Sequence, residues 1–306
     1  MLPALLASGC FAFSVVFAHR SARILGGIEA NFWRLIGATI FLGTWAFGWG
    51  QGLTTVAFPI LFLSGIIGIG IGDIGLFQAL PRIGPRLSLL LIQCLTAPFA
   101  ALIEWLWLGA RLTPAEIFWA GLILAGIGVS LAPGHAGALP RKAWVPGVAY
   151  SLLGALGGAL GAVLSRQAYA ILAREGETLD WATAAFQRLV GGLLTAAIML
   201  LIVRGRQVRT PWSAPGGKPT NDAGERWRRA WPWVLANSLA GQTIGVTFYQ
   251  WAFATTRTGI VLPIVAMSPL LAMPITRVMN QEPITLRALA GGAVAVAGVI
   301  GLALRH

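Results

Sequence analysis

The stretches Phe32-Trp33-Arg34-Leu35-Ile36-Gly37 and Phe186-Gln187-Arg188-Leu189-Val190-Gly191 carry the same Phe-x-Arg-Leu-x-Gly signature. Each copy stands near the start of a long apolar segment, and one copy lies in each half of the chain. This repetition indicates that one bundle of transmembrane helices was duplicated. Such an architecture is much commoner in transporters than in membrane enzymes.

The composition around the two copies is that of an integral membrane protein. Hydrophobic residues make up 57% of the 306 positions and charged residues only 10%, against about 25% charged in a soluble domain. A spanning helix needs about 20 mostly apolar residues, and continuous apolar runs favour helices over a β-barrel. Ten such segments can be drawn, at about 3–19, 30–49, 58–80, 87–108, 115–133, 146–171, 182–203, 232–254, 259–279 and 286–304.

The basic residues indicate how these ten spans are oriented. Most of the lysines and arginines fall in the loops after the first, third, fifth, seventh and ninth spans, including the long 204–231 loop. Because cytoplasmic loops collect Lys and Arg, we expect a bacterial inner-membrane protein with both termini in the periplasm. The net charge of +12 then reflects topology and attraction to anionic lipids, not nucleic-acid binding.

The duplication can be followed along the chain beyond the signature. Phe77-Gln78 corresponds to Tyr249-Gln250, and Leu112-Thr113 to Ile284-Thr285, both at a separation of 172. We therefore expect an all-α protein made of two five-helix repeats, 1–140 and 141–306, the second containing a flexible, basic cytoplasmic loop at 204–231. Five is an odd number, so the second repeat must lie inverted, with a substrate site near the midplane between the halves.

A family resemblance rests on two further runs. These are Pro98-Phe99-Ala100-Ala101-Leu102-Ile103-Glu104-Trp105-Leu106-Trp107-Leu108-Gly109-Ala110-Arg111-Leu112-Thr113 and Gly121-Leu122-Ile123-Leu124-Ala125-Gly126-Ile127-Gly128. Together with the doubled arginine, they make nearly the whole chain resemble the ten-helix EamA-type branch of the drug/metabolite transporter superfamily. The resemblance implies a secondary transporter, often an exporter of amino acids or related metabolites, with a central cavity.

Asp73 is the leading candidate for a functional side chain. It is the only acidic residue well inside a predicted span, and an ionised carboxylate there is costly unless it is paired or hydrated. A structural acid hydrogen-bonded to neighbouring helices is the alternative. Its helical face continues through Gly70 and Phe77, whose equivalents in the second half, at the spacing of 172, are Gln242 and Tyr249. Proton coupling through Asp73 is a hypothesis.

Other polar and aromatic residues within the spans are weaker candidates for substrate contacts. Gln78 and Gln250 recur at equivalent positions, and such amides can contact a zwitterionic ligand or simply bridge helices. Gln93 is open to the same two interpretations. Ser14 can bond to its own helix, and Trp251 could stack on a ligand.

Arginines and prolines supply the remaining candidates. Arg34 and Arg188 could attract an anionic group, although snorkelling to lipid headgroups is the more frequent use of such residues. The prolines Pro263, Pro269 and Pro274 predict that the span at 259–279 is kinked or interrupted, which could provide a hinge. Two further residues, Glu104 and His19, lie near span ends, and we expect them at the membrane interface.

Enzymatic chemistry finds little support in the sequence. The histidines His19, His135 and His306 are far apart, and neither a metal cluster nor an activated nucleophile is visible. Gly70-Ile71-Gly72-Asp73-Ile74-Gly75 matches Gly-x-Gly-x-x-Gly but lies inside an apolar span, where small residues serve helix packing rather than dinucleotide binding. We expect no catalytic residue, metal or cofactor.

The sequence therefore predicts a secondary transporter that exports amino acids, aromatic ones included, or related small polar metabolites by alternating access. A multidrug-type cation exporter is the alternative, although such sites usually expose a membrane glutamate rather than one Asp among amides. A channel, a lipid scramblase and a membrane enzyme are weaker alternatives. Expected partners are a small-molecule substrate, the lipid bilayer and a coupling proton.

Overall fold

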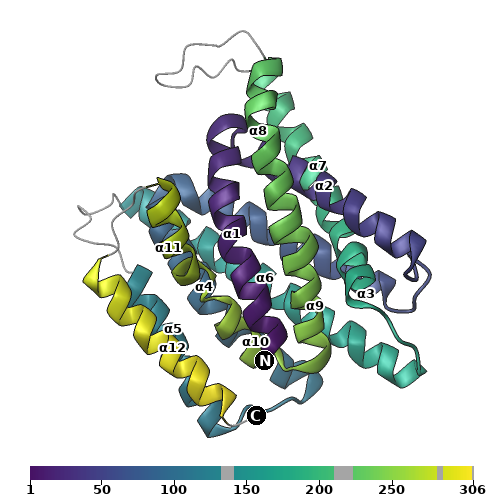
Figure 1. Cartoon of the computed structure of the whole chain (residues 1–306), viewed down its shortest axis with the longest axis vertical. Helices are drawn as coiled ribbons and strands as arrows, with labels where there is room; N and C mark the ends of the chain where they lie inside the picture. Colours follow the sequence, from purple (N-terminus) through teal and green to yellow (C-terminus); the bar gives the residue numbers. More distant parts are fainter. Residues whose placement is uncertain (132–140, 210–222, 281–284, 305–306) are drawn as a thin grey trace.

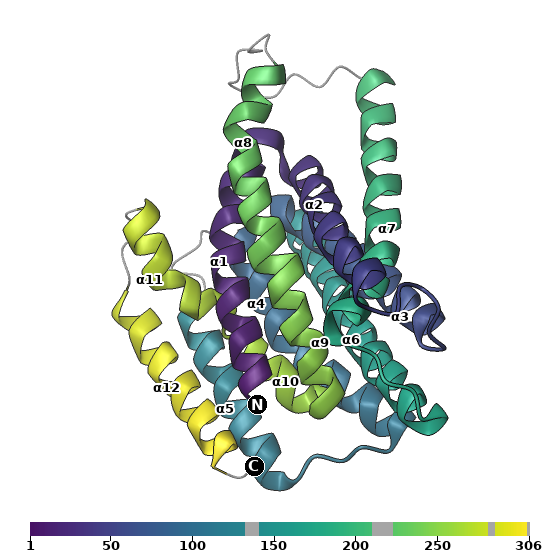
Figure 2. The same ribbon diagram turned by 45° about the vertical axis from the view of Figure 1, so that its right-hand side comes forward.

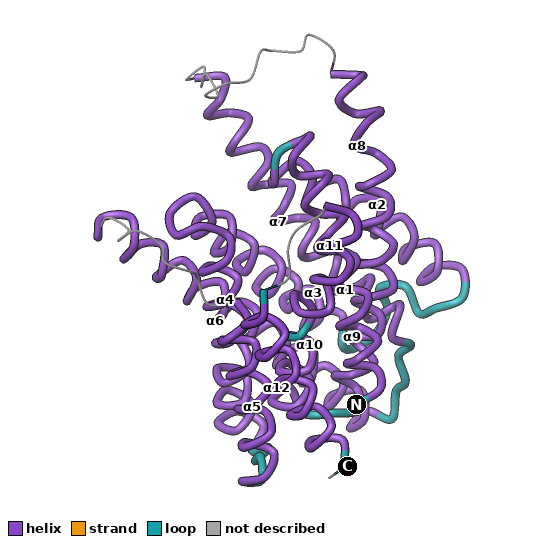
Figure 3. Tube along the Cα trace, turned by 60° about the vertical axis from the view of Figure 1, so that its left-hand side comes forward, coloured by secondary structure: helices purple, strands orange, loops and turns teal. Residues whose placement is uncertain are grey.

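The structure is a computed structural model that describes residues 1–131, 141–209, 223–280 and 285–304 (Figure 1). Ile284, His135, His306 and the centre of the 204–231 loop lie outside these residues, and the side chain of Phe77 is not described. All regular elements in the described ranges are helices (Figure 3). They are α1 (Leu2–Leu25), α2 (Gly27–Gly48), α3 (Phe58–Gly65), η1 (Ile66–Ile71), α4 (Gly72–Leu108), α5 (Pro114–Leu131), α6 (Arg141–Glu175), α7 (Trp181–Arg209), α8 (Ala223–Asn237), η2 (Ser238–Gly245), α9 (Val246–Thr255), α10 (Thr258–Val265), α11 (Ser268–Asn280) and α12 (Leu286–Ala303).

Eight helical segments in the described ranges are long and apolar enough to cross a membrane. They correspond to eight of the ten predicted spans, and the chain is therefore a multi-pass membrane protein. The other two predicted spans, 30–49 and 232–254, are also helical, in α2 and in α8, η2 and α9. The second of these is divided among three elements, and the first of them, α8, begins before the span with the charged run at 225–229. A total of ten spans stays a prediction.

The long helix α4 contains one predicted span and the end of another. Gly75 and Ile92 both contact Gly154 of α6, and both Gly72 and Thr96 approach Gly158 of the same helix. A straight helix would separate Gly75 from Ile92 by about 25 Å. The chain therefore reverses direction near residue 83, between the predicted spans 58–80 and 87–108, while keeping helical geometry.

Glycines allow η1 and α4 to pack directly on α6. A Cβ added to Gly161 would lie 2.6 Å from the Cα of Gly68, and one added to Gly75 would lie 2.5 Å from the backbone N of Gly154. Such distances leave no space for a larger residue, because small residues are what permits close backbone approach. The prediction that the glycine run at 70–75 serves helix packing is confirmed.

The two halves of the chain carry the same helix irregularity. Both η1 and η2 are π-helical segments, and their first residues, Ile66 and Ser238, are 172 positions apart. This is the spacing at which Phe77-Gln78 and Tyr249-Gln250 correspond. Wide helical turns of this kind are rare and occur mostly at functional sites. The shared position supports the duplication, while the inverted arrangement of the repeats stays a prediction.

The helices form a central group with a helix pair at each edge (Figures 1 and 2). In the centre, α1 packs on α8, η2, α9 and α11, while α6 packs on α3, η1 and α4. At one edge α5 pairs with α12, and at the other α2 pairs with α7. The start of α1 and the end of α12 lie at one end of the molecule, opposite the end of α7 and the start of α8.

Candidate functional site

Arg188 lies in the third turn of α7 and is enclosed by three other helices. The residue is 6% exposed. Its Nη1 donates to Ser165 Oγ of α6 at 3.4 Å, and its guanidinium carbon lies 5.8 Å from the ring centre of Tyr249 in α9. Gly68 of η1 closes the third side, because a Cβ there would lie 2.8 Å from Arg188 Nη2. The repeated signature therefore directs this arginine into the bundle, not to the lipid headgroups.

The guanidinium of Arg188 has no counter-charge among the described residues. None of the ion pairs in the described part of the chain includes it, and its Nε has no hydrogen-bond partner there. The hydroxyl of Tyr169 in α6 is likewise buried without a partner, and it lies within electrostatic reach of Arg188. A buried cation without a counter-ion costs several kcal/mol. The surroundings of Arg188 thus suit a ligand that carries an anionic group.

Arg34, at the corresponding position of the first signature, has different surroundings. Its Nε donates to Asn31 Oδ1 at 2.7 Å, and its Nη2 lies 3.9 Å from Asp73 Oδ2. Asn31 Nδ2 in turn donates to Asp73 Oδ2 at 2.6 Å. The side chains of Arg34 and Asp73 are 18% and 20% exposed. Asp73 is therefore held by α2 and has its own counter-ion, the arrangement expected of a structural acid as well as of a coupling site.

The second half carries two buried amides near the corresponding helical segment. Gln242, the repeat equivalent of Gly70, lies in η2, where it is 8% exposed and its Oε1 has no partner among the described residues. Gln250 in α9 is fully buried, and neither Oε1 nor Nε2 has such a partner. Buried amides normally form hydrogen bonds. Both side chains are consequently available to bind a polar ligand or water.

Three other predicted contact residues are placed differently. Gln78 Oε1 accepts a hydrogen bond from Arg82 Nη1 one turn later, at 2.8 Å, so this amide is used within α4. Gln93 lies half-buried on α4. Ser14 of α1 is buried and donates to Asn237 Oδ1 of α8 at 2.6 Å, which leaves Asn237 Nδ2 without a described partner.

The aromatic candidates pack mainly against other rings. Trp251 stacks on Trp181, with ring centres 4.3 Å apart and planes at 10°. The ring of Tyr249 contacts Phe11 edge to face, with ring centres 5.7 Å apart, and its centre lies 4.2 Å from the ring centre of Phe253. Trp251 is thus already stacked within the protein, whereas Tyr249 joins an aromatic cluster directly beside Arg188.

The span predicted at 259–279 is interrupted. Helix α10 ends at Val265 and α11 begins at Ser268, with Ala266 and Met267 between them. Pro263 lies inside α10, Pro269 at the second position of α11 and Pro274 inside α11. Pro269 is tolerated because a helix start has free N–H groups. The interruption is confirmed, and its use as a hinge stays a prediction.

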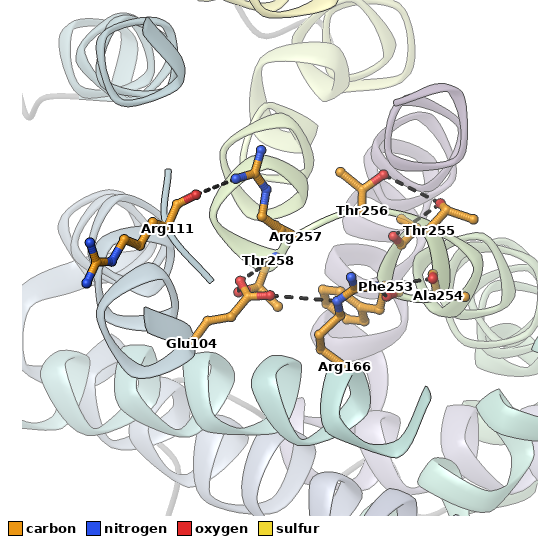
Figure 4. A network of polar contacts seen from close by, with 10 residues as sticks. Glu104, Arg111, Arg166, Phe253, Ala254, Thr255, Thr256, Arg257 and Thr258 are labelled. Atoms are coloured by element: carbon orange, nitrogen blue, oxygen red, sulfur yellow. Dashed lines mark hydrogen bonds and ion pairs between the residues drawn. The ribbon is translucent and has the colours of Figure 1, made fainter. Parts of the chain in front are cut away.

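A polar network closes the end of the bundle at which α4, α6 and α10 meet (Figure 4). Glu104 of α4 accepts hydrogen bonds from the backbone N of Thr258, at 2.8 Å, and from its Oγ1. Arg166 of α6 lies 3.7 Å from Glu104 Oε1 and donates to the Phe253 carbonyl at 2.7 Å. Glu104 therefore caps α10 and links it to α4 and α6.

A second part of the network joins α10 to α5. Arg257 donates to Glu116 Oε1 and to the Arg111 carbonyl. Glu116 Oε2 accepts from the backbone N of Thr113 at 2.6 Å, while Thr113 Oγ1 accepts from the backbone N of Glu116 at 3.3 Å, a capping box. The Thr-Pro-Ala-Glu run at 113–116 carries that signal in the sequence.

Several residues of these groups were not found by sequence reasoning. The prediction that Glu104 lies at the water interface is wrong, because the residue is 2% exposed and bonded to α10. His19 is exposed, as expected. Asn31 lies 42 residues from Asp73, Ser165 lies 23 residues from Arg188, and Tyr169 is in another helix than Arg188, so no motif marks these residues. Their spacing becomes meaningful only when the helices are packed.

Comparison with known proteins identifies a family and similar solved structures. A family model described as "EamA-like transporter family" matches residues 1–132 and 145–304, one range in each half of the chain. A solved structure titled "Crystal structure of protein" superposes with a TM-score of 0.70 at 20% sequence identity, covering 99% of this chain and 95% of that chain. At this identity the likeness shows the fold alone. No match was found among curated proteins.

Proposed function

The chain belongs to the EamA-like transporter family, and from this premise we propose that it exports amino acids or related small polar carboxylates across the bacterial inner membrane. Membership of this family makes the protein a drug/metabolite transporter in a lipid bilayer. The substrate, the direction and the mechanism belong to the proposal. Aromatic amino acids are included, because Tyr249, Phe11 and Phe253 form an apolar surface beside Arg188.

The observation that carries the proposal is the buried, uncompensated Arg188. A guanidinium presents a planar set of donors that matches a carboxylate and can form two parallel hydrogen bonds with it. The unpartnered hydroxyl of Tyr169 adds a donor within electrostatic reach of the same group. Binding of a carboxylate would supply the missing charge, so a site of this kind favours an anionic or zwitterionic solute.

The alternative, a multidrug-type cation exporter, fits these charges less well. A hydrophobic cation would be repelled by Arg188, and the acid that could attract it, Asp73, is already paired with Arg34. A cation site needs an available acid in the membrane. Glu104, the second acid of α4 and a buried one, is used by Thr258 and Arg166.

Alternating access is supported by contacts at both ends of the bundle. At one end, Arg20 Nη2 of α1 donates to the Met279 carbonyl of α11 at 2.9 Å, and Glu29 of α2 pairs with Arg204 of α7 at 3.2 Å. At the other end lies the Glu104 network (Figure 4). A carrier that opens to the two sides in turn breaks one set while keeping the other. The proposal includes a cytoplasmic Arg20 end and periplasmic termini, which the excess of Lys and Arg in the loops at the Arg20 end supports.

Proton coupling is a further part of the proposal, and Asp73 is the residue assigned to it. The carboxylate is partly exposed and bonded to a single helix, α2. Taking up a proton would release Arg34 and loosen the contact between α2 and α4. No ATP-binding motif is visible in the sequence, which agrees with ion-coupled rather than ATP-driven transport.

The test is uptake by the purified protein in liposomes, with the 20 amino acids assayed with and without a pH gradient. We expect uptake of a subset that includes aromatic amino acids, and faster uptake when a proton gradient is imposed. Phenethylamine and tyramine serve as matched probes, since they keep the ring and the amine of phenylalanine and tyrosine but lack the carboxylate. Transport of these amines in the absence of amino-acid transport would replace the proposal with the cation exporter.

A further inference from the structure

An apolar groove lies between α4, α5 and α10. Its volume is about 560 Å³. Apart from Arg111, every residue that lines it is apolar, among them Leu102, Trp105, Ile117, Gly121, Gly259 and Pro263. Nothing in this lining could hold a polar solute within the groove.

The groove opens toward the surface that faces lipid. Leu102, Trp105 and Ile117 line it and are 48%, 47% and 57% exposed. In a membrane protein, large exposed apolar side chains on a spanning helix contact acyl chains. The wall formed by α5 has free space as well, because a Cβ added to Gly121 would meet nothing within 4 Å. Hydrocarbon from the bilayer is therefore the occupant that matches both the lining and the position.

A cation stands where the groove meets the end of α4. Arg111 lies in the link between α4 and α5, and its guanidinium points away from the network in which its carbonyl takes part (Figure 4). No hydrogen bond or ion pair of this side chain is found within the described residues. Arg257, which donates to the Arg111 carbonyl, forms an ion pair with Glu116, so these two charges neutralise each other. The groove thus ends at one net positive charge, which attracts an anionic headgroup.

We propose that this groove is a binding site for an anionic phospholipid, with an acyl chain between α4, α5 and α10 and the phosphate at Arg111. The acyl chain of the lipid would contact Gly259 and Pro263 of α10, which line the groove. Helix α10 is the part of the interrupted helix that precedes the break at Ala266 and Met267. Lipid bound here therefore stabilises one position of α10 relative to α4 and α5. This inference does not depend on the identity of the transported solute.

The first test is native mass spectrometry of the full chain in detergent, titrated with phosphatidylglycerol and with phosphatidylcholine that carries the same acyl chains. We expect the first phosphatidylglycerol to bind about fivefold more tightly, the factor that one basic residue contributes near an anionic headgroup. Arg111→Gln should remove this preference and leave phosphatidylcholine binding unchanged. Arg174→Gln, which removes another exposed arginine, is the matched control and should keep the preference.

The position of the acyl chain is tested by filling the groove. Gly121→Leu places a side chain in the open space and should weaken binding of both lipids, whereas Gly128→Leu should not. Gly128 lies two turns later on α5, its Cβ direction is also open, and it is not part of the groove. Equal affinity of the wild type for the two lipids overturns the headgroup assignment. Unchanged lipid binding in Gly121→Leu overturns the assignment of the acyl chain.

A fluorescence measurement keeps the proposal testable if Gly121→Leu does not fold. Phosphatidylglycerol with brominated acyl chains, added at one molecule per protein in detergent, should quench Trp105, which lines the groove. Trp105→Phe should then remove more of the quenching than Trp107→Phe, a neighbour that lies outside the groove. Equal quenching in the two variants contradicts the proposal. A dimer mass that forms in native mass spectrometry when lipid is removed also contradicts it, because a second copy of the protein would then be the occupant of the groove.

Discussion

Two arginines at corresponding positions of the repeated signature have opposite electrostatic surroundings. Arg34 is partly exposed and shares Asp73 with Asn31. Arg188 is buried beside two tyrosines and a serine, without a described carboxylate. Both copies of the signature thus carry a cation, and only the first has a counter-ion among the described residues. The unpaired copy is the one at which a ligand can supply the charge.

Removing the charge of Arg188 should impair substrate binding more than folding. We expect Arg188→Gln to lower the apparent affinity for a transported amino acid at least tenfold, because a hydrogen bond to a charged group contributes about 1.5–3 kcal/mol. Arg188→Lys keeps the charge but not the planar fork and should recover only part of the affinity. Concentration-dependent uptake into liposomes measures both effects. Wild-type affinity in Arg188→Gln would exclude this residue from the site.

Asp73→Asn separates the structural role of this carboxylate from its coupling role. Loss of the charge leaves Arg34 without its counter-ion, so we expect a drop in stability of about 1–3 kcal/mol, below the cost of breaking a fully buried pair. The coupling hypothesis adds that the pH dependence of transport disappears in this variant. Thermal unfolding and pH profiles of uptake measure the two effects. A destabilised variant with an unchanged pH profile would leave Asp73 as a structural acid.

At the residue level, the sequence could identify individual polar side chains but not their partners. Asp73 is visible because an acid among apolar residues is rare. Asn31, Tyr169 and Ser165 are ordinary residues whose contacts depend on how α2, α6 and α7 pack. The sequence alone favours contact of Arg188 with lipid headgroups, because the position of a residue along a helix does not reveal which side of that helix is enclosed.

At the scale of helices, irregular geometry occurs where the two halves correspond. The π-helical segments η1 and η2 begin 172 residues apart. η1 carries Gly68 against Arg188, and η2 carries the unpartnered Gln242. A wide turn shifts the register of the residues that follow it, so both segments re-aim side chains toward the centre. Proline spacing predicts the interruption between α10 and α11, whereas no residue pattern predicts the π-helices.

The contact between η1 and α6 should not tolerate a side chain larger than hydrogen. Gly161→Val places a branched side chain where the backbone of Gly68 lies, and overpacking of this kind costs about 1–3 kcal/mol. Gly9→Val on α1 is the matched control, because a Cβ at Gly9 meets nothing within 4 Å. Thermal unfolding in detergent measures the difference. Equal melting temperatures for the two variants would contradict the close contact between η1 and α6.

For the whole molecule, the reciprocal contacts of the two halves are those that an inverted duplication produces. Helix α1 packs against the second half, and α6, the first helix of that half, packs against the first half. The inverted arrangement itself stays a prediction, made from the odd number of spans per repeat. The sequence could not predict the helical reversal within α4 or the three-part division of α8, η2 and α9. Those features depend on local packing and not on apolar length.

Locking α1 to α11 should stop transport if the halves move relative to each other. Ser8 Oγ and Ser268 Oγ lie 3.4 Å apart across this contact, close enough for a disulfide in Ser8→Cys/Ser268→Cys. The background carries Cys10→Ser and Cys94→Ala. We expect oxidation to abolish uptake and reduction to restore it, with either single cysteine variant unaffected. Full uptake by completely cross-linked protein would exclude relative motion of α1 and α11.

The most direct test of the account is counterflow of radiolabelled phenylalanine in liposomes that contain either the wild type or Arg188→Gln. Unlabelled phenylalanine, phenylalaninamide and phenethylamine are placed inside as exchange partners, and they differ at the carboxylate. We predict that phenylalanine alone drives exchange in the wild type and that Arg188→Gln abolishes this exchange. Equal exchange with phenethylamine in the wild type, or undiminished exchange in Arg188→Gln, would contradict a carboxylate site at Arg188.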